Sequence, residues 1–142
     1  MIKNKKVKIT ELGFLPYSEA WDIQEEYFSN TIAVKRQNRQ LDYSILTENH
    51  LLLVEHPPVF TLGKSGKIDH LLLKEEVLKS KGIAFFKTNR GGDITFHGPG
   101  QLVGYPILDL DNFFTDIHKY LRYLEEIIIK TLSDFGLNST RS

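Results

Sequence analysis

The sequence has 142 residues, of which 41% are hydrophobic, and this is enough for one domain with its own core. Lys and Arg total 18 and Asp and Glu total 18, so the formal charge is zero. This balance lacks the overall basic charge that is typical of proteins that bind nucleic acid or anionic membranes, so we expect neither as a partner. The chain contains no cysteine, which excludes disulfides and thiolate chemistry within these residues.

The hydropathy of the chain also limits its location. No apolar run approaches the roughly 20 residues that a helix needs to span a bilayer. The N-terminus is basic, with Lys3, Lys5 and Lys6, but it lacks the apolar stretch of a signal peptide. We therefore expect a cytoplasmic protein.

The first part of the chain alternates between strand and helix patterns. Residues 7–14 alternate apolar and polar side chains, as a half-buried strand does. A helical cap at Ser18 is followed by apolar residues at helical spacing as far as Ile32, which predict a long amphipathic helix. Residues 51–55 form a continuous apolar run that predicts a central strand, and the prolines in 56–58 end it because proline has no N–H for the ladder.

The second part contains shorter segments of both kinds. They are an extended piece at 59–62, a turn at 63–67, a helix at 72–81, strands at 83–88 and 102–108, and a helix from Ile117 to Leu132. Several strands lie too close in sequence for helical crossovers between them, which favours a mixed sheet. The strand at 102–108 is interpreted as buried. We predict an α/β (α+β) fold, a mixed sheet with flanking helices, in a single domain over residues 1–142.

Residues 90–101 form the most distinctive segment of the chain, because four glycines lie around an arginine and a histidine. The amides of Gly91–Gly92 beside the Arg90 guanidinium would suit an anionic or carbonyl oxygen. The His97 imidazole, held before a Gly-Pro-Gly turn, could accept or donate a proton near neutral pH. In an alternative interpretation, Arg90 has no ligand-binding role and is the partner of Asp93 in a structural turn. The residues alone predict a loop that binds an acyl or anionic group.

Other motifs give weaker signals. Residues 63–66 lack the glycine spacing of a phosphate-binding P-loop, and Gly91–Gly92 does not fit the dinucleotide fingerprint. The histidines are widely spread, without the spacing of a metal site, so we predict no metal centre. They are His50, His56, His70, His97 and His118.

The run RGGDITFHGPGQLVGYP, at residues 90–106, resembles the signature of the lipoyl(octanoyl) transferases, which are also called the lipoate-protein ligase B family. Residues 53–63 resemble a second block of that family, and residues 12–24, with Tyr17 and Gln24, resemble its N-terminal block. The resemblance extends over nearly the whole chain.

This resemblance implies a fold like the catalytic domain of biotin/lipoate protein ligases and the first step of protein lipoylation. In that reaction an octanoyl group passes from octanoyl-acyl carrier protein to a lysine of a lipoyl domain. The implied acceptors are the lipoyl domains of 2-oxoacid dehydrogenases and the glycine cleavage H protein. The implied route uses a thioester on an enzyme cysteine whose pKa a lysine lowers, and it needs no cofactor.

The resemblance also implies which residues bind the substrate, and it adds two pocket candidates, Tyr17 and His56. The family's cysteine and lysine both lie downstream of the matched region, beyond Ser142, so no catalytic residue is assigned in this chain. We expect an N-terminal portion of a transferase, with the C-terminal part of the domain absent, that is inactive as given. The implied substrate-binding residues are Arg90, Gly91, Gly92, Asp93, Ile94, Thr95, Phe96 and His97.

Two alternatives remain open at this point. One is an ATP-dependent lipoate or biotin protein ligase, although such ligases carry a longer R-R-x-x-G-G-G run and Arg90 is preceded here by Asn89. The other is a catalytically dead acyl-binding module, which would be consistent with a chain that has no cysteine.

Overall fold

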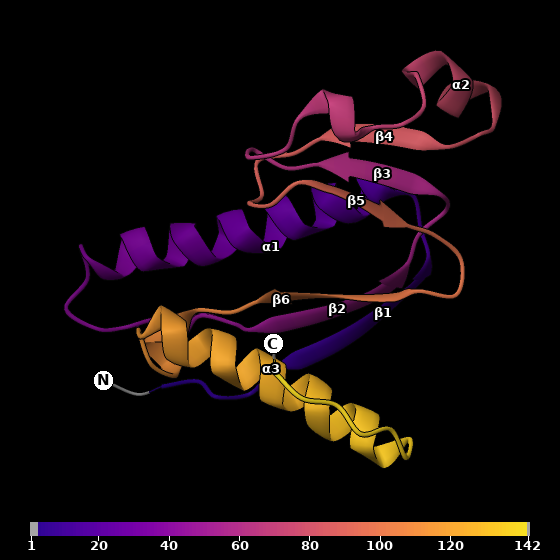
Figure 1. Ribbon diagram of the computed structural model, residues 1–142. Helices are drawn as coiled ribbons and strands as arrows, with labels where there is room; N and C mark the ends of the chain where they lie inside the picture. Colours follow the sequence, from indigo (N-terminus) through magenta and orange to yellow (C-terminus); the bar gives the residue numbers. More distant parts are fainter. Residues whose placement is uncertain (1–2, 142) are drawn as a thin grey trace.

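The computed structural model describes residues 3–141 and contains an α/β arrangement (Figure 1). The elements in chain order are β1 (Lys8–Phe14), α1 (Tyr17–Asn38), β2 (His50–Glu55), β3 (Val59–Leu62), the short helix η1 (Ile68–His70), α2 (Glu75–Ser80), β4 (Ala84–Lys87), β5 (Ile94–His97), β6 (Leu102–Ile107), the short helix η2 (Leu110–Asn112) and α3 (Ile117–Asp134).

Ser142 lies outside the described residues. Two predictions refer to this position. One is a single domain over residues 1–142, and the other places the family's cysteine and lysine beyond Ser142. The fold of residues 3–141 tests neither, so both stay predictions.

Within residues 3–141 the strands form two mixed sheets of three strands each, in the orders β1-β2-β6 and β4-β3-β5. In the first sheet β2 runs parallel to β1 and antiparallel to β6. In the second, β3 runs parallel to β4 and antiparallel to β5. The predicted α/β class is confirmed, with β2 as a central strand, but the strands are divided between two sheets. The prolines at 57–58 separate β2 from β3 and account for the division.

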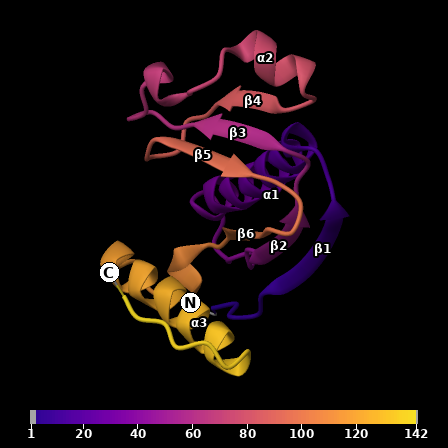
Figure 2. The ribbon, with the colours of Figure 1, turned by 45° about the vertical axis from the view of Figure 1, so that its right-hand side comes forward.

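Helix α1 lies between the two sheets in both views of the ribbon (Figures 1 and 2). Its Tyr27 ring stacks on His50 of β2 at 4.0 Å, and its Tyr17 ring packs on Phe86 of β4 at 5.2 Å between centroids. The helix begins at Tyr17, one residue before the predicted cap at Ser18. The preceding Pro16 has the extended backbone of an N-cap, and its carbonyl oxygen accepts from the amide of Ala20 at 3.1 Å.

The apolar core is small. Most of it lies where α1 meets the sheets, whereas Leu78 belongs to α2, which packs on β4. The most buried side chains of the core, each at most 1% exposed, are Ala20, Leu52, Val54, Val59 and Leu78. Strand β6, which was predicted to be buried, is instead a sheet edge with alternating exposure, and Leu102 is 70% exposed. The reason is that only one face of β6 contacts α1, so alternate residues face outward.

Part of the glycine-rich segment is a strand. Residues 94–97 form β5, which pairs antiparallel with β3, so the prediction of a loop over residues 90–101 is wrong for these four residues. The tetrapeptide Ile-Thr-Phe-His alternates in character as an edge strand does, but the glycines on both sides obscured that signal. The strand places His97 on the side of the sheet that faces the first sheet, in register with the buried Val59.

A network of buried polar groups lies at the other end of α1. Lys35 Nζ contacts Asp109 Oδ1 at 2.6 Å, and the hydroxyl of Thr47 donates to Asp109 Oδ2 at 2.7 Å. The amide of Asp109 donates to Asn49 Oδ1 at 3.0 Å. Because these residues come from α1, from the segment before β2 and from the segment after β6, the network fixes the helix to the first sheet.

Helix α3 contrasts with α1, because no residue in it is fully buried. It lies on the side of the first sheet that faces away from α1 (Figure 1). Apolar side chains on one of its faces, such as Leu121 at 54% and Ile128 at 58%, remain exposed to solvent. Over the described part of the chain, none of the helices combines the length and apolar character that a membrane crossing requires.

Candidate functional site

The segment from Arg90 to Asp93 is folded around the Arg90 guanidinium. Nη2 donates to the carbonyl oxygen of Thr61 at 2.9 Å, to the Thr61 hydroxyl at 2.8 Å and to the Asp93 carbonyl oxygen at 2.9 Å. Nη1 donates to the Gly91 carbonyl oxygen at 2.8 Å. The planar guanidinium thus binds both ends of its own loop and the neighbouring strand β3.

The loop lies directly on the end of β3 because the next position there is Gly63. A Cβ atom at Gly63 would lie 2.4 Å from the Gly92 oxygen and 2.7 Å from the Gly91 oxygen. Backbone bonds complete the contact, from the Gly63 amide to the Asp93 oxygen at 3.2 Å and from the Lys64 amide to the Arg90 oxygen at 2.9 Å. A glycine is therefore required at 63 by close approach of backbone to backbone.

Arg90 and Asp93 are partners in this turn, but through the Asp93 carbonyl oxygen and not through its carboxylate, which is bound by other neighbours. The carboxylate contacts the ring nitrogen Nδ1 of His70. Desolvation of the carboxylate acts to raise its pKa, but hydrogen bonds from His70 and from the amides of Ile94 and Lys67 outweigh it, and the pKa of Asp93 is lowered. The Asp93 side chain thereby ties the glycine loop to η1.

His56 forms the centre of a second cluster, at the junction of the two sheets. Its ring is fully buried, with Nδ1 2.8 Å from the Leu15 carbonyl oxygen and Nε2 2.9 Å from the Tyr105 hydroxyl. Because a carbonyl oxygen only accepts, Nδ1 carries the proton in the neutral ring and Nε2 accepts from Tyr105. Burial and the nearby Tyr17 raise the pKa of Tyr105 to about 12, against a hydrogen bond from Gln24, so the hydroxyl keeps its proton at neutral pH.

Tyr17 and His97 complete this cluster. The Tyr17 ring lies edge-on to His56 at 5.5 Å between centroids, and His97 lies at 6.1 Å from His56. His97 Nδ1 lies 2.6 Å from Gln101 Oε1, which orients its ring. Burial raises the pKa of Tyr17, and the positive charge of Arg90 acts in the opposite direction. Arg90 is therefore close enough to influence the Tyr17 hydroxyl, which connects the two clusters.

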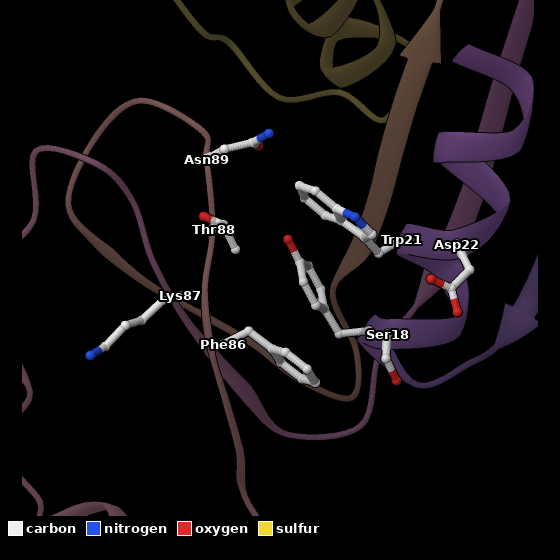
Figure 3. A pocket seen from close by; sticks show the side chains of 8 residues that line it. Ser18, Trp21, Asp22, Phe86, Lys87, Thr88 and Asn89 are labelled. Carbon is white, nitrogen blue, oxygen red and sulfur yellow. The ribbon is translucent and has the colours of Figure 1, made fainter. Parts of the chain in front are cut away.

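A groove of about 360 Å³ lies on the other side of Tyr17. Trp21 reaches into it from α1 and Phe86 from β4, while Thr88 and Asn89 follow along the chain toward Arg90 (Figure 3). Its volume lies at the lower end of the range for small-molecule sites, and three aromatic side chains, Tyr17, Trp21 and Phe86, contribute to its walls. The groove is lined by Tyr17, Ser18, Trp21, Asp22, Phe86, Lys87, Thr88 and Asn89.

Most of the residues predicted to bind the substrate lie close together in the structure, and a few face away from them. Arg90, Tyr17, His56 and His97 all lie around the junction of the sheets. Phe96 faces the opposite side of β5, where it packs on Phe60 at 5.0 Å and is 46% exposed. Alternation along β5 also turns Ile94 to that outer side and Thr95 to the inner side. Whether these residues contact a substrate stays a prediction.

The structure adds residues to the site that the sequence pattern does not indicate. Trp21 was interpreted only as part of a helical pattern, although its place four residues after Tyr17 puts both on one helix face. Nothing in the sequence indicates Thr61 and Phe86 as site residues, because the neighbours of a single strand residue become known only with the strand register. Tyr105 lies within the distinctive 90–106 run, but it is 49 positions from His56 along the chain, and this separation hid their contact.

Comparison with known families gives a match over most of the chain. The family described as the lipoyl protein ligase A/B catalytic domain matches residues 16–142. These residues include α1 and both clusters described above.

Curated relatives are similar over nearly the whole chain. An octanoyltransferase of Christiangramia forsetii is 60% identical over 139 residues, which are 98% of this chain and 59% of the relative. An octanoyltransferase of Flavobacterium johnsoniae is 58% identical, covering 98% of this chain and 60% of the relative. The chain thus spans about three fifths of the length of these relatives.

Solved structures share the fold at low identity. A bipartite lipoate protein ligase from Thermoplasma acidophilum aligns with a TM-score of 0.59 and 16% identity, covering 100% of this chain and 49% of that one. A lipoate-protein ligase A bound with ATP aligns with a TM-score of 0.56 and 17% identity, covering 97% of this chain and 49% of that one. At this identity they show the fold alone. Given the match over residues 16–142, the chain belongs to the lipoyl protein ligase A/B catalytic domain family.

Proposed function

We propose that this chain is the substrate-holding part of an octanoyltransferase, which moves an octanoyl group from octanoyl-acyl carrier protein to a lysine of a lipoyl domain. The observation that carries the proposal is the glycine loop at 90–93, held by Arg90 beside an aromatic groove. A medium-length acyl chain needs an apolar wall, and its thioester carbonyl needs polar donors at one end. The groove and the loop supply these two features side by side.

The chemistry of transfer is assigned to no residue of these 142. A thioester intermediate requires a thiolate, and the sequence contains no cysteine. The loop residues Arg90, Gly91 and Gly92 would shape the acyl end of the pocket, and His97 would position a reacting group or relay a proton. Tyr17 and His56 would line the same pocket. The proposed acceptors are lipoyl domains of 2-oxoacid dehydrogenases and the glycine cleavage H protein, and the proposed location is the cytoplasm.

The relatives favour this reaction over the ATP-dependent ligase reaction. The curated relatives at 60% and 58% identity are both octanoyltransferases, whereas the similar ligase structures are only 16% and 17% identical. The sequence also lacks the longer glycine run expected of a ligase, because Asn89 precedes Arg90.

A chimeric enzyme tests the proposal directly. This chain would replace the 139 matching residues of the Christiangramia forsetii octanoyltransferase, and octanoyl transfer from octanoyl-acyl carrier protein to a lipoyl domain would be followed by intact mass. We expect transfer without added ATP. The matched control is the same chimera carrying Arg90→Ala, in which the loop loses its four guanidinium bonds and transfer should fall on the order of a hundredfold.

A folded chimera that transfers no octanoyl group would contradict the proposal. Transfer from free octanoate that depends on ATP would favour the ligase instead. Binding of octanoyl-pantetheine to the chimera without any transfer would favour the acyl-binding module. Circular dichroism of each protein shows whether a loss of transfer is a loss of folding.

A further inference from the structure

Thr61 binds the Arg90 guanidinium and so holds it against the second sheet. It lies on β3, the central strand, in register with Phe86 of β4 and Thr95 of β5. Its side chain is completely buried. Its carbonyl oxygen and its hydroxyl both accept from Nη2 of Arg90, at 2.9 and 2.8 Å. Two acceptors on a rigid strand fix both the position and the orientation of a guanidinium.

Arg90 in turn fixes the peptide group between Gly91 and Gly92. Nη1 holds the Gly91 carbonyl oxygen at 2.8 Å. In a trans peptide the carbonyl and the following N–H point in opposite directions, so the N–H of Gly92 is turned away from the guanidinium. Among residues 3–141, no backbone carbonyl oxygen accepts from this N–H. Gly92 has a φ of 82°, which only glycine adopts readily, so the loop is built around this peptide orientation.

We propose that Thr61 is a positioning residue of the acyl site. It orients Arg90, and Arg90 orients the Gly92 N–H so that this group donates to the carbonyl oxygen of the bound acyl thioester. The identity of the ligand as an acyl thioester rests on the proposed function. The coupling from Thr61 through Arg90 to Gly92 is a property of the protein without ligand. A fixed backbone donor stabilises the negative charge that develops on such an oxygen, and its value depends on being held in place.

The first test compares Thr61→Val with Thr61→Ser in the 142-residue chain without ligand. Val keeps the shape of the side chain and removes the hydroxyl, while Ser keeps the hydroxyl. By NMR we expect the Arg90 guanidinium protons to exchange on the order of tenfold faster in Thr61→Val, with a shift of the Gly92 amide signal. In Thr61→Ser both signals should stay close to those of the unchanged protein. A purely packing role would be disturbed at least as much by Ser, which removes a methyl group.

The second test adds octanoyl-pantetheine to the same variants. We expect a saturable shift of the Gly92 amide in the unchanged chain, an affinity on the order of tenfold weaker in Thr61→Val, and recovery in Thr61→Ser. If Thr61→Val does not fold, Arg90→Lys takes its place in both tests, because lysine keeps the charge and loses the planar fork. We expect Arg90→Lys to shift the Gly92 amide signal as Thr61→Val would.

The outcomes separate the two proposals. Equal guanidinium exchange in the Val and Ser variants, or an unchanged Gly92 amide in Thr61→Val and Arg90→Lys, would overturn the role of Thr61. The expected changes in the free protein, together with no Gly92 shift on adding octanoyl-pantetheine to the unchanged chain, would support the coupling and overturn the acyl ligand, and with it the proposed function.

Discussion

Single residues in this site are held by several partners each, and this determines what a substitution does. Arg90 binds four acceptors, and His56 is bonded through both ring nitrogens. Removing such a residue leaves buried polar groups without partners, which costs more than the bonds themselves contribute. Substitutions here should therefore reduce stability as well as any activity, and the two effects need separate measurements.

Gly63→Ala tests the close approach of the loop to β3. We expect a loss of about 1–3 kcal/mol in the free energy of unfolding, because the new Cβ would overlap the backbone oxygens of Gly91 and Gly92, which cannot move independently. Urea denaturation gives this value. The matched control is Gly104→Ala in β6, where the nearest side-chain atoms are 3.7 Å away and the change should stay within about 1 kcal/mol. Equal losses in both variants would disprove the steric explanation.

His56→Ala tests the buried cluster. We expect a loss of about 2–4 kcal/mol, from the cavity and from the unpaired Leu15 carbonyl and Tyr105 hydroxyl. Tyr105→Phe, which removes one hydrogen bond and keeps the ring, should cost about 1 kcal/mol. Denaturant unfolding monitored through Trp21, the single tryptophan of the chain, provides the comparison. A smaller loss in His56→Ala than in Tyr105→Phe would show that the cluster is not held by His56.

At the scale of elements, α1 is fixed at both ends by different means. Tyr17 packs against Phe86 and His56 at its start, and Lys35 binds Asp109 near its end. The aromatic end forms the wall of the groove, whereas the polar end determines how the helix lies on the first sheet. A substitution in the polar network would therefore shift the groove wall, although none of its residues forms part of that wall.

The ion pair between Lys35 and Asp109 predicts a pH dependence of stability. Burial acts to raise the pKa of Asp109, but hydrogen bonds from Lys35 and Thr47 outweigh it and the pKa is lowered in the folded state. The stabilisation is thus complete above the unfolded-state pKa of about 3.9 and is lost as the pH falls through the lower folded-state value. Asp109→Asn should cost about 1–3 kcal/mol at pH 7 and flatten this acid limb.

The control for this prediction is Asp111→Asn. Asp111 also binds Lys35, at 2.7 Å, but its side chain is 59% exposed, so its loss should cost at most about 1 kcal/mol. Thermal unfolding from pH 2 to pH 7 measures both variants. An acid limb in Asp109→Asn as steep as in the unchanged chain would assign the pH dependence to other carboxylates.

At the scale of the whole molecule, the described residues leave much apolar surface in contact with water. The amphipathic helix α3 has no fully buried residue, and Ile9 and Leu102, on the edge strands of the first sheet, are 62% and 70% exposed. Within residues 3–141 the outer edges of β1 and β6 pair with no further strand, so their backbone groups can pair with other chains.

A dye-binding experiment measures this exposed surface. We expect the 142-residue chain to enhance anilinonaphthalene sulfonate fluorescence while it is folded, because the dye binds exposed apolar patches. Leu121 and Ile128 are seven residues apart and share one face of α3. The double variant Leu121→Glu, Ile128→Glu should reduce the enhancement with an unchanged circular dichroism spectrum. Equal enhancement in both proteins would place the dye site elsewhere.

The sequence by itself determined the two long helices, the central strand β2 and the family resemblance of the glycine-rich segment. Periodicity indicated α1 and α3, the apolar run at 51–55 indicated a central strand, and the glycine-rich run at 90–106 pointed to the family, because these signals depend only on neighbours along the chain. The sequence pattern did not distinguish β5 from the glycines beside it. The apolar residues of β6 predicted a buried strand, although β6 is an edge strand.

Only the tertiary structure decided which distant residues meet. The pairing of His56 with Tyr105, the binding of Arg90 by Thr61 and the placing of Trp21 opposite Phe86 each depend on strand register and on the position of α1 between two sheets. The two hydrogen-bonded pairs join residues 49 and 29 positions apart. No local pattern encodes them, because a side chain's own neighbours in sequence do not specify which strand or helix face will lie against it.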